Sequence, residues 1–317
     1  MDDPERGLDM KEQILQLMGT IIKLSIQHPE AEDLLIKAAA RLKEFEQRFS
    51  ANAEDSELMK INRQAGIAPV KVDQELFELI KIGKEQSLIA DSALNIAIGP
   101  LIQEWRIGFK DANYPLPEKI QSLLPLIDPA AIQLDEKKQT VYLEHAGMAI
   151  DLGALAKGYF ADKIIADFKK AGATAAFIDL GGNVLTYGAV PQRADGRWRI
   201  GIQNPFLPRE NYVAVVKVQN ESVVTSGIYE RKFDWQGQSY HHIFDSQTGY
   251  PIKTNLASLT IVSGESLAGE IWTTRLFGRS AQEVLAELNQ LDDIEGIVIT
   301  TDQQIAYSEG LKGRIEL

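Results

Sequence analysis

The chain has no cysteine among its 317 residues. This absence excludes disulfide bonds, thiolate catalysis and zinc sites built from cysteine. It also excludes a lipid anchor attached to a cysteine of this chain. Histidine is scarce as well, with four residues, so there are few candidates for a general base of the imidazole type.

Features of membrane and nucleic-acid proteins are missing too. No apolar run reaches the roughly 20 residues that cross a bilayer, and residues 1–6 lack the basic start and apolar stretch of a signal peptide. Lys and Arg number 33 against 45 Asp and Glu, which gives a net charge of −12 and argues against a general nucleic-acid binder. We therefore expect a cytoplasmic protein with no membrane span, or an exported, membrane-anchored protein if a signal sequence was removed.

The composition that remains is that of an ordinary globular protein, with 44% hydrophobic and 25% charged residues. The length allows a substantial core in one large or two modest domains. We expect an N-terminal tail over residues 1–12 and a single folded unit over residues 13–317. Whether that unit has two lobes is left open.

Apolar spacing predicts helices and strands in a mixed order. Helices are expected over residues 30–49, 56–62, 73–87, 117–123, 154–170 and 266–277, and after Ser280, where Glu283 completes a capping box. Strands are expected over residues 20–26, 140–144 (paired with 148–151), 175–180, 184–187, 198–202, 212–218, 222–225, 256–262, 296–300 and 304–307. Gln236-Gly237 predicts a hairpin turn between residues 233–235 and 239–242. This order of elements predicts an α+β fold.

The segment from Asp151 to Asp162 is central to the prediction. A short apolar strand leads through Gly153 into a helix that Gly172 ends, and Lys157 lies one turn inside that helix. Free N–H groups and the helix dipole favour an anion at such a helix start. Neither of the common phosphate-binding glycine patterns is present. Two interpretations stay open: an anion site of another design, or a helix packed on a sheet with Lys157 in solvent.

Two of the four histidines are adjacent. His241 and His242 fall on a predicted strand, where neighbouring side chains point to opposite faces. They are poor partners for one metal ion, so a single histidine acting as general base is the better functional hypothesis. The alternative is a hairpin histidine bonded to the backbone. His28 and His145 are expected at the surface.

Glu270 and Thr274 share one face of a predicted helix, with Thr273 beside them. A carboxylate and a hydroxyl suit a cation that prefers oxygen ligands, such as Mg²⁺. The alternative is a surface Glu with a Thr bonded to its own helix. Thr225-Ser226-Gly227 follows a strand and suits either a ligand contact or a tight turn.

Together these segments resemble the FAD:protein FMN transferase family, also called the ApbE family. The resemblance covers about residues 18 to 296. Its blocks, in the family's order, are Met18-Gly19-Thr20; Phe49-Ser50 with Ser56-Glu57-Leu58 and Asn62; Ile98 to Leu101 with Trp105; Asp151 to Gly158 with Asp162; Gly181-Gly182-Asn183; Thr225 to Gly227 with Tyr229 and Arg231; and His242 to Asp245 with Thr248-Gly249.

The resemblance implies a T-fold-like α+β architecture with FAD in a cleft. It implies Mg²⁺-dependent transfer of FMN from FAD to a Thr or Ser hydroxyl of an acceptor protein, with release of AMP. The residues it assigns to FAD are Met18, Asn52, Ala93, Leu94, Asn95, Asp151, Lys157 and Phe244. The carbonyl of Ala154, with Glu270, Thr273 and Thr274, would hold Mg²⁺. His242 would take the proton from the incoming hydroxyl.

The chain departs from the family pattern at several positions. Asn52 stands where Tyr is frequent, Asn95 where Asp is usual, and Ser246 where Pro is usual. Glu270 replaces the metal-binding Asp, and Arg275 stands where small residues are common. These departures keep two other hypotheses open: a hydrolase that splits FAD into FMN and AMP, and a non-catalytic FAD carrier.

Overall fold

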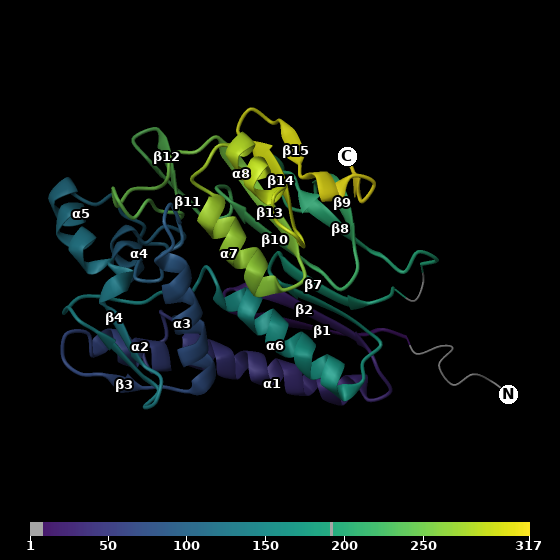
Figure 1. Cartoon of the computed structure of the whole chain (residues 1–317), viewed down its shortest axis with the longest axis horizontal. Coiled ribbons are helices and arrows are strands. Elements are labelled where there is room, and N and C mark those ends of the chain that lie inside the picture. Colours follow the sequence, from purple (N-terminus) through teal and green to yellow (C-terminus); the bar gives the residue numbers. More distant parts are fainter. Residues whose placement is uncertain (1–8, 191–192) are drawn as a thin grey trace.

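The computed structural model describes residues 9–190 and 193–317 of the chain (Figure 1). At its centre is an eight-stranded antiparallel sheet in the order β1-β2-β6-β7-β10-β13-β14-β15. These strands are β1 (Lys11–Leu17), β2 (Thr20–Gln27), β6 (Ala175–Leu180), β7 (Asn183–Gly188), β10 (Ser222–Gly227), β13 (Leu256–Ser263), β14 (Ile294–Thr300) and β15 (Ile305–Tyr307).

Smaller sheets and the helices complete the described fold. The sheets join β16 (Ile315–Glu316) with β9 (Tyr212–Val218) and β8 (Trp198–Gln203); β3 (Val70–Lys71) with β5 (Thr140–Leu143) and β4 (Ile132–Asp135); and β11 (Lys232–Trp235) with β12 (Gln238–His241). The helices are α1 (Ala31–Phe49), α2 (Glu57–Arg63), α3 (Gln74–Ser87), α4 (Gly99–Trp105), α5 (Pro117–Leu123), α6 (Ala156–Ala171), α7 (Ser266–Leu276) and α8 (Ala281–Leu288).

Period-two patterning gives the large sheet two apolar faces. Ile22, Leu24 and Ile26 of β2 are fully buried in the core formed with α1 and α6. Phe177, one residue out of phase on β6, packs instead with the cluster under β8 and β9. Helices α7 and α8 cover the β13–β14 end of the same sheet (Figure 1). The predicted α+β class is therefore confirmed as helices on one side of an antiparallel sheet.

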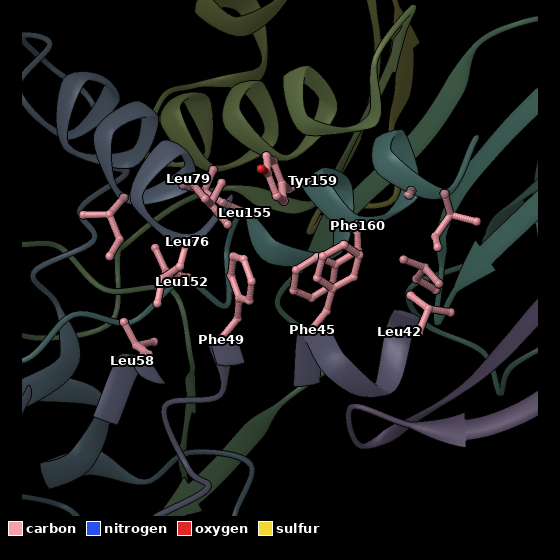
Figure 2. Packing of buried hydrophobic residues seen from close by; sticks show 14 of the residues in the cluster. Leu42, Phe45, Phe49, Leu58, Leu76, Leu79, Leu152, Leu155, Tyr159 and Phe160 are labelled. Atoms are coloured by element: carbon pink, nitrogen blue, oxygen red, sulfur yellow. The ribbon is translucent and has the colours of Figure 1, made fainter. Parts of the chain in front are cut away.

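Aromatic packing between α1 and α6 fixes α6 on the sheet. The rings of Phe45 and Phe160 are stacked, with centroids 4.5 Å apart and an interplanar angle of 6° (Figure 2). Phe49 meets Phe160 edge-on at 5.0 Å. Gly172 ends the helix with φ of 92°, the left-handed cap that the sequence predicted. The aromatic contacts of Phe160 lie in the N-terminal part of α6 and hold that end of the helix in place.

Two strand predictions need correction. The predicted pairing of residues 140–144 with 148–151 is wrong, because β3 and β4 occupy both edges of β5. Ala149 makes only an isolated parallel bridge to Ile98. At the N-terminus the structure has a hairpin where one strand was expected, and its turn is Met18-Gly19, with φ of 53° and 69°.

The predicted N-terminal tail is only partly visible. Residues 1–8 lie outside the described residues, and β1 already begins at Lys11. The tail boundary at residue 12 therefore falls inside a strand. Nothing else tests the proposed division of the chain.

Candidate functional site

Helices α6 and α7 meet through polar groups. The carboxylate of Asp162, on α6, accepts hydrogen bonds from the backbone N–H groups of Ser266 and Leu267, each at 2.8 Å. Asp162 thus caps the start of α7 from a neighbouring helix. Burial raises its pKa to about 6, although the two N–H groups oppose that shift.

Further along α7, Glu270 is buried against α6 with 5% of its surface exposed. Its carboxylate accepts a hydrogen bond from Asn183 Nδ2 at 2.9 Å and another from the backbone N–H of Gly158. Burial raises the pKa of Glu270, while the charge of Lys157 and both hydrogen bonds oppose the rise. A Cβ at Gly158 would lie 2.6 Å from the Ser266 carbonyl, so glycine permits this close approach.

These contacts make the two helices antiparallel, because Asp162 lies at the start of α7 whereas Gly158 lies beside Glu270. One turn beyond Glu270 on α7 comes Thr274, and one turn before Gly158 comes Ala154. The predicted metal ligands therefore fall on the same end of the helix pair. Thr273 is buried and donates its hydroxyl hydrogen to the Glu270 carbonyl at 3.1 Å, which leaves its oxygen lone pairs free.

This donor set fits a magnesium ion. It offers a buried carboxylate, hydroxyl oxygens and a carbonyl oxygen, and Mg²⁺ prefers oxygen ligands. The alternative hypothesis of a surface Glu270 is wrong, because the side chain is buried. Across residues 9–190 and 193–317 no group of three or more His, Asp or Glu side chains gathers as a metal site, so backbone and hydroxyl oxygens would have to supply part of the ligands of an ion here.

Lys157 lies where several elements of the site converge. It is half-buried in the first turn of α6, and its charge acts on Glu270, Asp179 and His242. Asp179 ends the buried strand β6 and accepts the Gly182 N–H at 2.7 Å. Burial raises the pKa of Asp179, and the charge of Lys157 is among the opposing effects. Lys157 is therefore not merely in solvent, and an anion site at this helix start stays a prediction.

The adjacent histidines make different contacts. His241 uses both ring nitrogens: Nε2–H donates to the Ile252 carbonyl at 2.9 Å, and Nδ1 accepts the Ile243 N–H at 3.3 Å. The Nδ1–H of His242 donates to the Arg231 carbonyl at 3.3 Å. Because a carbonyl only accepts, this bond leaves the lone pair of the neutral ring on Nε2. His241 is thus bonded to the backbone, and His242 keeps a nitrogen that can take a proton.

The electrostatic surroundings keep His242 neutral. Burial lowers its pKa to about 4, and the nearby charge of Arg231 adds to the effect. The same Arg231 charge acts on Asp151, whose Oδ1 accepts the Gly153 N–H at 2.7 Å. Burial raises the pKa of Asp151 against both of these influences. The charge of Arg231 therefore acts both on Asp151, just before α6, and on His242.

Three residues of this site carried no predicted role. Arg231 and Asn183 stood in the motif blocks, but nothing in the sequence showed what they contact. Asp179 did leave a signal, since it is a charged residue inside the apolar strand Ala175–Leu180. Charged side chains are rare inside apolar strands, so such a residue is a candidate for a functional role.

The predicted FAD contacts Met18 and Ala93 lie near this site. The Met18 N–H donates to Glu46 at 2.6 Å, and the hairpin turn it occupies continues into Thr20, which packs against Gly181. The Ala93 N–H donates to the Arg275 carbonyl at 3.3 Å, at the end of α7. Both segments therefore border the end of the sheet and helices where Lys157 lies.

The other residues predicted to contact FAD make hydrogen bonds and packing contacts within the protein itself. Asn95 Nδ2 donates to the Ile127 carbonyl at 2.8 Å and to Ser246 Oγ at 3.1 Å, so two departures from the family pattern contact each other. Leu94 is buried in the main core. Phe244 is also buried, with its ring centroid 5.9 Å from that of Trp105. Asn52 is exposed in the turn after α1, where its N–H donates to Ser50 Oγ.

No helix within the described residues has the length and apolar character that a bilayer crossing needs.

Comparisons with known proteins give the family. Residues 18–298 match the model of the ApbE family. A protein of Klebsiella pneumoniae (strain 342) named FAD:protein FMN transferase is 40% identical over 293 residues, which covers 92% of this chain and 90% of that protein. A protein of the same name from Treponema pallidum (strain Nichols) is 34% identical and covers 95% of this chain and 87% of its own length.

Solved structures agree with the sequence comparisons. The ApbE protein of Thermotoga maritima superposes with a TM-score of 0.85 at 25% identity, over 96% of this chain and 99% of that one. The apo form of Pseudomonas stutzeri flavinyl transferase ApbE shares the fold, with a TM-score of 0.82 at 23% identity over 96% of each chain. With these matches and the geometry of the α6–α7 site, the chain belongs to the ApbE family.

Proposed function

We propose that this chain is a Mg²⁺-dependent FAD:protein FMN transferase that moves FMN from FAD to a Thr or Ser hydroxyl of an acceptor protein. The observation that carries the proposal is the convergence at Lys157, whose charge acts on Glu270, Asp179 and His242. An anion site, a cation site and a neutral base thus lie together. The name shared by the two relatives supports the same activity.

In this proposal FAD would lie beside the N-terminal end of α6. Its pyrophosphate would face Lys157 at the start of the helix, where the positive end of the helix dipole favours an anion. The Met18 turn and residues 93–95 border the same region and would contact the rest of the dinucleotide. Asp151, held by Gly153, shapes the loop that leads into the helix.

The chemical step is a displacement at phosphorus. The acceptor hydroxyl oxygen attacks the FMN phosphorus of FAD, the bond from that phosphorus to the bridging oxygen breaks, and AMP leaves. The hydroxyl proton goes to Nε2 of His242, the nitrogen that the Arg231 contact leaves unprotonated. The ammonium of Lys157 stabilises negative charge on the phosphoryl oxygens.

The magnesium ion would be held by Glu270, by the hydroxyls of Thr273 and Thr274 and by the carbonyl of Ala154. Its chemical contribution would be to neutralise charge on the pyrophosphate oxygens. Asn183 fixes the Glu270 carboxylate at 2.9 Å, so the side chain is oriented before any ion binds.

The direct test is incubation of the purified protein with FAD, Mg²⁺ and candidate acceptor proteins, followed by mass spectrometry. The proposal predicts covalent FMN on a Thr or Ser of one acceptor and an equal amount of AMP. Free FMN with AMP and no modified protein would favour the hydrolase hypothesis, and unchanged FAD would favour the carrier. The identity of the acceptor and the cytoplasmic location stay predictions.

A further inference from the structure

A surface groove opens beside the Arg231 segment. It has a cavity volume of about 310 Å³. One wall comes from the loop between β8 and β9, with Phe206, Leu207 and Arg209, and the other from the segment that enters β11, with Tyr229, Glu230 and Lys232. We refer to it as the 206–232 groove.

The first wall is apolar although it faces solvent. Phe206 and Leu207 are 44% and 52% exposed. Two neighbouring large apolar side chains that border a groove offer an anchoring surface for a partner's side chain. They lie on a connecting loop, which is where binding residues are often found.

Positive charge comes from both walls. Arg209 pairs with Glu230 at 2.6 Å, whereas Lys232 has no ion-pair partner among the described residues. The two cations exceed the one carboxylate, in a chain whose net charge is −12. A local positive excess on an acidic protein favours an acidic partner over a basic one.

The groove is linked to the candidate site through the chain segment that contains Arg231. Arg231 stands between Glu230 and Lys232 in the chain, and its carbonyl accepts the hydrogen bond from His242. The charge of Arg209 also acts on Asp179, the carboxylate on which Lys157 acts. A protein bound in the groove would therefore contact the residues on either side of Arg231, whose carbonyl holds the proposed base.

We propose that the 206–232 groove docks the acceptor protein, through a segment that carries an apolar side chain and at least one carboxylate next to the reacting Thr or Ser. This inference rests on the proposed transferase function. Phe206 and Leu207 would contact the apolar side chain, and Lys232 would pair with the carboxylate.

A binding measurement tests the groove without requiring the reaction. The probe is a short fluorescein-labelled peptide with Leu and two Asp around a Val, which replaces the reacting Thr. Its affinity is measured by fluorescence anisotropy for the full chain saturated with FAD and Mg²⁺. Lys232→Glu and Phe206→Ala should each weaken binding by about tenfold, the scale of a lost anchor.

The matched control is Lys137→Glu, which makes the same charge change at an exposed lysine in the turn between β4 and β5. It should bind the peptide as the wild type does. The affinity of the wild type for the peptide should also fall as the salt concentration rises, because salt screens the exposed ion pair between Lys232 and the peptide carboxylate. Equal affinity of the wild type and both groove variants would overturn the docking proposal. So would equal binding of a peptide with Lys in place of Asp, or loss of peptide binding as FAD is added.

A parallel transfer assay with the Thr peptide separates this proposal from the function. Transfer by the wild type, with a KM for the peptide that Lys232→Glu and Phe206→Ala leave unchanged, would refute the groove and keep the transferase. The peptide could instead bind, and lose affinity in Lys232→Glu and Phe206→Ala, while no FMN is transferred to it or to any acceptor protein. That result would refute the transferase function and, with it, the acceptor segment as the occupant of the groove.

Discussion

Helix α6 packs on two neighbours by different physical means. Toward α1 it presents aromatic rings, with Phe160 stacked on Phe45 and edge-on to Phe49 (Figure 2). Toward α7 it presents the N–H of Gly158, which donates to the Glu270 carboxylate, and the carboxylate of Asp162, which accepts from the N–H groups of Ser266 and Leu267. The first face excludes water, and the second face brings charges together.

The two faces contribute differently to stability. Burial of the aromatic face is favourable and positions the helix. Burial of Glu270 and Asp162 raises their pKa values, so holding them ionised near pH 7 costs free energy that the hydrogen bonds only partly offset. The comparison teaches that the apolar face stabilises an arrangement that the polar face by itself would not hold.

Phe160→Ala should break the apolar face. The loss of a stacked, buried ring predicts a decrease of about 3–5 kcal/mol in the free energy of unfolding. Urea titration followed by circular dichroism measures it. The volume-preserving control Phe160→Leu should cost less than about 1.5 kcal/mol. FAD affinity of the folded fraction should not change, and a decrease below about 1 kcal/mol for the Ala variant would show that the rings do not hold α6.

His242→Ala should leave the packing of α6 on α1 and α7 intact and remove the proposed general base. The transfer rate should fall by about a hundredfold or more, the usual scale for a lost general base. Titration calorimetry should give an unchanged FAD dissociation constant. Weaker FAD binding with unchanged turnover of bound FAD would make the residue structural.

The pH profile of transfer sharpens the role of His242. Its pKa is lowered to about 4, so the ring stays neutral and able to accept a proton down to about pH 5. Activity should therefore fall only below that point, with a midpoint near pH 4, whereas an ordinary histidine would give a midpoint near 6.5. Circular dichroism at each pH shows whether the fold persists. A midpoint near 6.5 contradicts a desolvated, neutral ring.

Glu270→Gln tests the polar face directly. The Gln side chain keeps an oxygen that can accept from Asn183 but loses the charge that attracts Mg²⁺. The Mg²⁺ concentration for half-maximal transfer should rise by about tenfold to a hundredfold, and the fold should remain intact because a buried charge has been removed. Glu270→Asp is the control and should stay active. Identical Mg²⁺ midpoints for the wild type and the Gln variant would mean that Glu270 is not a metal ligand.

Much of the fold was predictable where the signals are local. The strand Ala175–Leu180 was predicted at its observed bounds, the helix before it within two residues, and Gly172 as its cap. Ser280 and Glu283 form the predicted capping box. Each of these features depends on residues a few positions apart, which is the range over which periodicity and capping operate.

Long-range contacts were the part that the sequence did not reveal. Asp162 caps a helix more than a hundred positions away, and nothing near either residue indicates that pairing. The partner of Thr140–Leu143 was misassigned because several strands compete for the same edge. The sequence could still single out candidate site residues, since Lys157 and His242 stood in ordered motif blocks and Glu270 shared a helix face with Thr274; their roles stay predictions. Arg231 and Asp179 gained their roles only from the packing.

FAD binding by Lys157→Ala and Lys163→Ala is the measurement that most directly separates the two sides of α6. Both substitutions remove one lysine from the same helix, but Lys163 pairs with Glu78 at 3.1 Å, on the side away from the site. Lys157→Ala should weaken FAD binding by about tenfold, more at low salt, because a charge facing phosphate is lost. Lys163→Ala should leave the dissociation constant unchanged. An unchanged dissociation constant for Lys157→Ala, or an equal loss in both variants, would contradict a pyrophosphate site at the start of α6.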